Sequence, residues 1–128
     1  MTGTDLPEAE PFSLAVRYLH EDDHRRGAVV AIGGELDVSQ VATFRATLVS
    51  LLVDGVSPLV VDLADLAFMD SSGLGALVAA HKKARVLKHR LVVACPHGVT
   101  LDLLSLTGLI RFLNVTRTVE EAVTESPD

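Results

Sequence analysis

The stretch LVVDLADLAFMDSSGLGAL, residues 59–77, joins a short apolar run to a pattern of helical period. Its first five residues, LVVDL, are almost continuously apolar, which is typical of a strand buried on both faces. From about Ser71 to Lys88 apolar residues recur at helical spacing and predict a helix. The inward side chains expected for this helix are Leu74, Leu77, Val78, Ala84 and Leu87.

A second helix is predicted before this strand, in DVSQVATFRATLVSLLVDG, residues 37–55. Ser39 or Asp37 can cap its start, and Gly55 stands where a helix stops. A helix, a buried strand and another helix in succession indicate parallel βαβ units, so the predicted fold class is α/β. The apolar residues at helical spacing are Val41, Phe44, Leu48, Leu51 and Leu52.

The flanking segments add strands and helices at both ends. Residues 12–19 alternate with the period of a strand, and with residues 28–36 they predict a β-hairpin. A strand at 90–95 precedes a short helix that Gly108 closes. Thr118 and Glu121 form a capping-box pattern that starts a final helix. A weaker last strand is predicted between these two helices, over residues 110–115.

These elements predict a single domain with the order β-β-α-β-α-β-α-β-α. We expect a mixed sheet of four or five strands packed with about four helices, because the chain of 128 residues is long enough for one hydrophobic core. The domain is expected over residues 12–124, between a polar N-terminal tail at 1–11, expected to be disordered, and a C-terminal tail at 125–128.

Composition narrows the classes of function. A net charge of −6 disfavours a nucleic-acid binder and an anionic membrane surface as partners. The single cysteine, Cys95, cannot form an internal disulfide, which fits a reducing cytoplasm, and its place in a strand favours a core role. The N-terminus lacks the pattern of a signal peptide and no window has the length of a membrane span, so we expect a cytoplasmic protein.

Several motifs imitate catalytic sites without their context. HEDDH, residues 20–24, matches the H-E-x-x-H zinc pattern but falls in the expected hairpin loop, so we expect no metal site. GLGALV, residues 73–78, lacks the third glycine of a dinucleotide fingerprint, and no Walker lysine follows. Ser71 lacks the nucleophile-elbow pattern, and His81 lies more than two helical turns away, so we expect no catalytic residue.

Two features are left open by the residues alone. The basic run over residues 82–90 fits a solvated helix face, or an electrostatic docking patch for an acidic partner. In MDSSGLG, residues 69–75, Asp70 or Ser71 can cap the helix, yet Gly73 and Gly75 weaken its first turns and remove side chains around the serines. Such a bare approach, just past the carboxyl end of a strand, suits contact with another protein.

Three segments together resemble a known family. GGELDVSQVATF, LVVDLADLAFMDSSGLGAL and LLSLTGLIRFLNVTRTVEEAV are similar to the anti-sigma factor antagonists of bacteria, within the STAS domain family, and the similarity covers about residues 12–123. The resemblance implies a non-enzymatic regulator that binds an anti-sigma factor, itself a serine kinase, and so frees a sigma factor. Phosphorylation of Ser71 is expected to release the kinase.

The same resemblance implies the other components of the switch. The ATP belongs to the partner kinase, so no cofactor is expected, and a serine phosphatase would restore unmodified Ser71. The residues expected to contact the partner are Asp37, Met69, Asp70, Ser72, Gly73 and Leu74. Three alternatives stay open: a scaffold subunit of a stress-signalling complex or of a lipid-transport system, a small enzyme with Ser71 as its nucleophile, and direct nucleotide binding.

Overall fold

The computed structural model describes residues 11–20, 26–95 and 98–124 of the chain. Strands β1 (Ser13–His20) and β2 (Arg26–Leu36) pair antiparallel, in register from Ser13 opposite Gly33 to His20 opposite Arg26. This pairing confirms the predicted hairpin. β1 forms one edge of the sheet, so β2 is covered on one side by β1 and on the other by the next strand, β3 (Leu59–Asp62).

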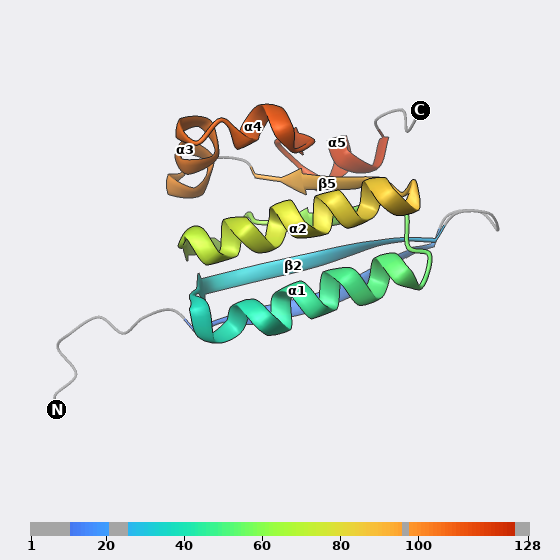
Figure 1. The fold of residues 1–128 in the computed structure, drawn as a ribbon, viewed down its shortest axis with the longest axis horizontal. Helices are drawn as coiled ribbons and strands as arrows, with labels where there is room; N and C mark the ends of the chain where they lie inside the picture. The colour runs from blue at the N-terminus through green and yellow to red at the C-terminus, as the bar shows by residue number, and fades with distance from the viewer. Residues whose placement is uncertain (1–10, 21–25, 96–97, 125–128) are drawn as a thin grey trace, which may run out of the picture.

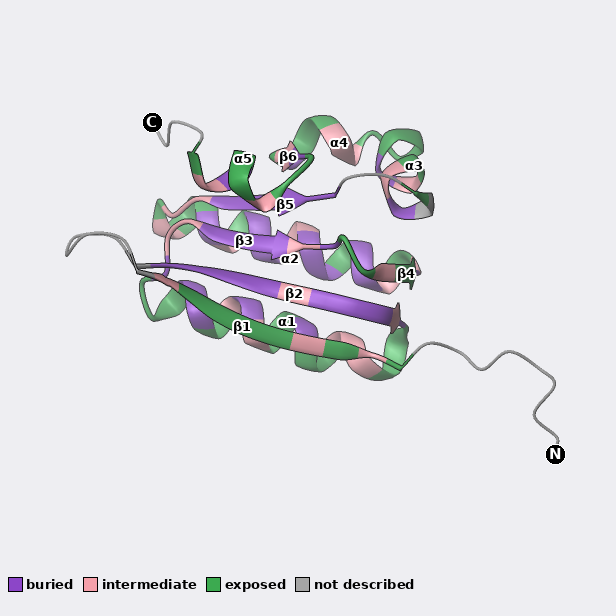
Figure 2. Cartoon of the chain, turned by 180° about the vertical axis from the view of Figure 1, so that it is seen from behind, coloured by how far each residue is buried: buried purple, intermediate pink, exposed green. Residues whose placement is uncertain are grey.

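The rest of the sheet is parallel. Strands β5 (Leu91–Ala94) and β6 (Val115–Thr116) continue it in the order β1-β2-β3-β5-β6. The helices α1 (Val38–Val53) and α2 (Ser71–Leu87) are the crossovers of the two predicted βαβ units, and they lie side by side on one face of the sheet (Figure 1). The short helix α5 (Val119–Thr124) lies on the opposite face (Figure 2).

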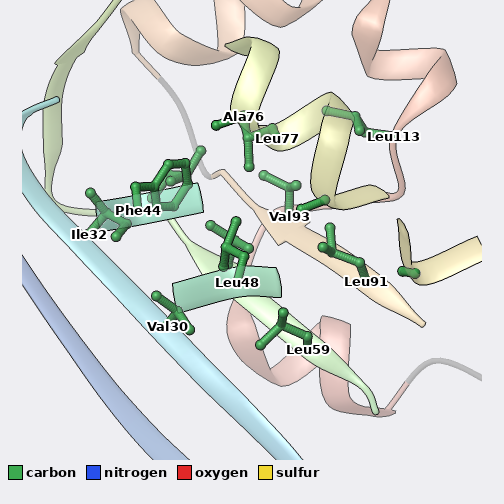
Figure 3. Close-up of a cluster of buried hydrophobic side chains, with 14 of the residues drawn as sticks. Val30, Ile32, Phe44, Leu48, Leu59, Ala76, Leu77, Leu91, Val93 and Leu113 are labelled. Carbon is green, nitrogen blue, oxygen red and sulfur yellow. The ribbon is translucent and has the colours of Figure 1, made fainter. Parts of the chain in front are cut away.

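Successive side chains of the central strands point into two different hydrophobic clusters, one on each face of the sheet. Leu59 and Val61 of β3 point into the large cluster under α1 and α2, whereas Val60 points into a small cluster with Ala122 of α5. Both faces of β3 are therefore buried, which explains why its sequence is a continuous apolar run. Phe44 from α1 fills the large cluster beside the strands (Figure 3).

A short strand that the sequence did not predict, β4 (Leu66–Met69), precedes α2. It pairs in parallel with the end of β2, outside the main strand order, after a register shift between Gly34 and Glu35. Ser71 does lie just past the carboxyl end of a strand, as predicted, but this strand is the partly exposed β4 and not the buried strand β3.

The last strand predicted over residues 110–115 was also wrong in extent. Helix α3 (Val99–Leu106) ends two residues before Gly108, whose φ of +79° favours glycine, and another helical turn, α4 (Leu109–Phe112), follows. Leu109 and Leu113 both pack against the core, four residues apart, which is helical spacing. Only Val115 and Thr116 remain for β6.

The α/β fold class is confirmed, with six strands and five helices in the described ranges rather than four or five strands and about four helices. The additional elements are β4 and α4. Residues 1–10 and 125–128, where most of the two tails was predicted, lie outside the described residues. The domain expected over residues 12–124 stays a prediction in its exact bounds.

Candidate functional site

The N-termini of α1 and α2 meet at one end of the helical layer (Figure 1). The strands that lead into these helices bring them together, because β2 and β4 end side by side with Leu36 opposite Met69. The residue that follows each strand is the N-cap of a helix, Asp37 for α1 and Asp70 for α2. The strand register thus places two aspartates, far apart in the sequence, as neighbours at one edge of the molecule.

The two caps have the same local geometry. The carboxylate of Asp37 accepts hydrogen bonds from the Ser39 backbone N–H at 2.9 Å and from the Ser39 hydroxyl at 2.6 Å. Asp70 accepts from the Ser72 N–H at 3.0 Å and from the Ser72 hydroxyl at 2.5 Å. In each pair, the bond from the backbone N–H satisfies a donor that the first turn of a helix leaves free.

These hydrogen bonds stabilise both carboxylates in the charged form. The Ser39 hydroxyl is the main cause that lowers the pKa of Asp37, although the charge of neighbouring Asp70 raises it. The Ser72 hydroxyl is the main cause that lowers the pKa of Asp70. Both groups are therefore anionic at neutral pH, and the site carries two negative charges side by side.

Ser71 and Ser72 differ in what their hydroxyls do. Ser72 is half-buried and its hydroxyl is bound to Asp70. Ser71 is the first residue of α2 and is exposed, and within the described part of the chain its hydroxyl forms no hydrogen bond. Of the adjacent serines, Ser71 therefore presents the hydroxyl that another protein can reach.

Three of the six residues expected to contact a partner are buried beneath the serines. Met69 is 3% exposed, Leu74 is 6% exposed, and Gly73 is buried against Met69 and Leu36. The interpretation that Gly73 bares the surface was wrong, because its missing Cβ makes room for a core side chain. Of the six, Asp37 is exposed and Asp70 and Ser72 are half-buried, so these three are the ones that reach the surface.

Gly75 fits its interpretation better than Gly73 does. It is exposed, and a Cβ placed on it would meet nothing within 4 Å. The surface one turn beyond Ser71 is therefore open. The hydrogen bond of the Ser39 hydroxyl to Asp37 was not predicted, although the repeated Asp-x-Ser pattern in Asp37-Val38-Ser39 and Asp70-Ser71-Ser72 was the signal for it.

The residues and motifs that imitate catalytic sites are not part of the site at the N-termini of α1 and α2. His81 is buried and its ring contacts Phe112 of α4. Along α2, His81 lies about 15 Å from Ser71 at 1.5 Å per residue. Cys95 is buried, as predicted, and burial raises the pKa of its thiol. Most of HEDDH, at residues 21–24, lies outside the described residues, and the described residues contain no cluster of three or more metal-ligating side chains.

Residues 19–122 match the model of the STAS domain. The chain belongs to the STAS domain family. Among STAS relatives, it is 31% identical over 103 residues to the anti-sigma-F factor antagonist RsfB of Mycobacterium tuberculosis, covering 80% of this chain and 83% of the relative. It is 32% identical over 91 residues to an anti-sigma-B factor antagonist of Staphylococcus epidermidis, covering 71% and 84%.

Solved STAS structures share the fold. An anti-sigma factor antagonist from Mycobacterium paratuberculosis superposes with a TM-score of 0.73 at 26% identity, over 89% of this chain and 96% of the other. The Bacillus cell fate determinant SpoIIAA, solved in its phosphorylated form, superposes with a TM-score of 0.63 at 26% identity, over 88% and 96%. In this STAS domain, none of the helices within the described ranges is long and apolar enough to span a membrane.

Proposed function

We propose that this STAS domain is an anti-sigma factor antagonist whose binding to its partner is switched off by phosphorylation of Ser71. The observation that carries the proposal is the contrast between the adjacent serines: the hydroxyl of Ser72 is bound to Asp70, whereas Ser71 is exposed and its hydroxyl is unbound among the described residues. A protein kinase needs such an accessible hydroxyl.

Relatives support the class of function. The similar proteins of Mycobacterium tuberculosis and Staphylococcus epidermidis are named antagonists of anti-sigma factors. SpoIIAA, which shares the fold, exists in a phosphorylated form. We infer an anti-sigma factor with serine kinase activity as the partner, a sigma factor that is freed when this partner is held, and a cytoplasmic location.

The place of Ser71 allows a phosphate without unfolding. A phosphoserine adds roughly −1.5 to −2 charges at neutral pH. At the first residue of α2 this charge meets the positive end of the helix dipole and free backbone N–H groups, which favour anions. Ser71 is exposed, so its phosphate remains in water. The modified chain is expected to keep its fold.

The same phosphate opposes binding. Asp37 and Asp70 already place negative charge at this end of the helical layer. Burying a dianion beside them in an interface, without a new cationic partner, costs several kcal/mol. A loss of about 4 kcal/mol weakens binding about a thousandfold, which is enough to release the partner. The switch is electrostatic.

The proposal assigns no catalysis to the chain itself. His81, the histidine of α2, is buried against Phe112 and is too far from Ser71 to act as its base. ATP and the transfer of its phosphate therefore belong to the kinase, and a separate serine phosphatase returns Ser71 to its free form. The chain needs no cofactor for this role.

Phosphate mapping tests the proposal directly. Immobilised Ser71→Ala should capture the anti-sigma kinase and hold it in the presence of ATP, whereas Ser71→Asp should remain folded and bind it about a hundredfold or more weakly. With the captured kinase and ATP, wild type and the matched control Ser72→Ala should both be labelled on Ser71. Label on Ser72 alone, or equal binding by the Ala and Asp variants, would falsify the assignment.

A further inference from the structure

Positive charge is concentrated in one part of the chain. Residues 71–101 contain five of the 11 Lys and Arg and none of the 17 Asp and Glu. The rest of the chain is therefore strongly acidic. The five cations are Lys82, Lys83, Arg85, Lys88 and Arg90.

Most of these cations belong to the surface of α2 and its C-cap. Lys82, Arg85 and Lys88 are exposed and Lys83 is half-buried; we call these four residues the cationic face. Arg90 is excluded, because its guanidinium donates to the Ala122 carbonyl at 3.0 Å and so holds α5. The adjacent helix α1 has no acidic residue from Val38 to Val53, and its C-cap is the exposed Asp54.

The cationic face is not neutralised within the described part of the chain. None of its four side chains forms an ion pair or a hydrogen bond with a described residue. The nearest acid along α2 is the N-cap Asp70, about 18 Å from Lys82 at 1.5 Å per residue. Charges that far apart are largely screened at physiological ionic strength, so the cationic face is free to pair with an external anion.

The cationic face is continuous with the surface of Ser71. Ser71, Gly75, Lys82 and Val86 are all exposed and lie within a sector of about 60° on the helix. Lys82 is about 16 Å along the axis from Ser71. Gly75 has open space around it, and Val86 is 76% exposed. A single interface of about 800 Å² per partner spans this distance.

We propose that the cationic face docks an acidic surface patch of the same kinase that receives Ser71. This inference rests on the proposed function and adds a recognition element remote from the modified residue. The kinase is expected to present carboxylates opposite Lys82 and Arg85, and a basic group opposite Asp37 and Asp70. Such opposite patches orient the kinase along α2, with its active site at the N-terminus of the helix.

The mixed charge of the helical layer favours a protein over a uniform polyanion. Nucleic acid or an anionic membrane would gain from the cationic face but be repelled by Asp37 and Asp70 at the end of the same helices. The net charge of −6 adds a general repulsion. Only a protein surface can carry both signs at the matching positions.

Charge reversal tests the docking. The Kd of the captured kinase is measured for wild type, for Lys82→Glu/Arg85→Glu, and for the matched control Arg17→Glu/Arg117→Glu. The control changes charge equally at exposed residues outside the α1–α2 layer. We expect binding about tenfold or more weaker for the first variant and within about twofold of wild type for the control. The difference should shrink when ionic strength rises from about 0.05 M to about 0.5 M.

The outcomes separate this inference from the proposed function. If the kinase binds wild type and both reversals bind equally, the docking is overturned while the Ser71 switch stands. If no kinase binds, the Ser71 switch fails, and NMR titration with a tetraglutamate peptide, which is too short to reach from Lys82 to Asp70, still tests the surface. Shifts confined to α2 amides near Lys82, and absent in Lys82→Glu/Arg85→Glu, support an acidic protein surface. The docking proposal is overturned if duplex DNA or phosphatidylglycerol vesicles bind more tightly than the acidic peptide, or if the peptide shifts amides outside α2.

Discussion

Ser71 and Ser72 are chemically identical and adjacent, yet one helical position makes them different. The N-cap carboxylate of Asp70 reaches the residue two positions on, so it binds the backbone and hydroxyl of Ser72 and leaves Ser71 free. Ser39 takes the same position after Asp37. Sequence could predict a cap at each helix, but which hydroxyl the cap would bind follows from the backbone geometry of the first turn.

Removing one hydroxyl should change the titration of Asp70. Ser72→Ala removes the main cause that lowers the pKa of Asp70, so this pKa should rise toward its ordinary value. The lowered pKa stabilises the fold at neutral pH, and this contribution is lost as pH falls through it. Carboxyl-carbon NMR measures the pKa directly. Ser71→Ala is the control and should leave it unchanged; equal shifts in both variants would contradict the cap geometry.

Among the helices and strands, those with a clear hydrophobic pattern were predicted from the sequence. The helices α1 and α2 and the buried strands β3 and β5 were predicted because their apolar residues repeat at 3.6 residues or run continuously. β4 was missed since two of its four residues are exposed. α4 lies where a strand was predicted, because Ile110 and Phe112 fit either structure and the positive φ of Gly108 that allows another turn is a tertiary feature.

The same limit applies to the glycines of α2. A glycine early in a helix can open a surface or admit a neighbour, and the sequence pattern does not distinguish the two. In the fold, the Met69 side chain packs against Gly73, where a Cβ would stand, whereas Gly75 faces open space. The exposed Ser71 and the half-buried Asp70 were thus predicted at the surface of the candidate site, whereas Gly73 was misplaced because the packing of β4 beneath α2 decides its burial.

Alanine at the two glycines should have opposite effects. A Cβ on Gly73 would lie 2.5 Å from Met69 Cγ and 3.1 Å from Leu36 Cδ2, so Gly73→Ala should lower the free energy of unfolding by about 1–3 kcal/mol. Gly75→Ala meets nothing within 4 Å and should raise it by about 0.5–1 kcal/mol through helix propensity. Urea denaturation measures both. A stable Gly73→Ala would show that the first turn of α2 is not closely packed.

In the whole molecule, the surface at the N-termini of α1 and α2 lies apart from the hydrophobic core under the two helices. Ser71, the proposed switch residue, is exposed at the N-terminus of α2, while the other side of α2 packs on the core through Leu77, Ala80 and Ala84. His81 continues this inner side and contacts Phe112, which joins α2 to the α4 segment. We therefore expect a charge added at Ser71 to be tolerated, whereas a charge added at His81 should lower global stability.

Acid should reveal His81 as a titrating group of the core. Burial, and secondarily the charge of Arg85, lowers the pKa of His81 below its ordinary 6.5. Above that value both folded and unfolded chains hold it neutral. As pH falls below it, the unfolded chain takes up a proton that the folded chain resists, so the free energy of unfolding falls by at most about 1.4 kcal/mol per pH unit.

The apolar variant His81→Leu isolates this contribution from the other histidines. His81 is 6% exposed, and its Nδ1 forms no hydrogen bond within the described residues, so leucine removes no observed polar contact of that atom. Urea denaturation between about pH 7 and about pH 5 should show a smaller loss of stability for His81→Leu than for wild type. Parallel curves would mean that His81 is protonated equally in both states, and α2 would then hold a charged histidine against Phe112 at acid pH.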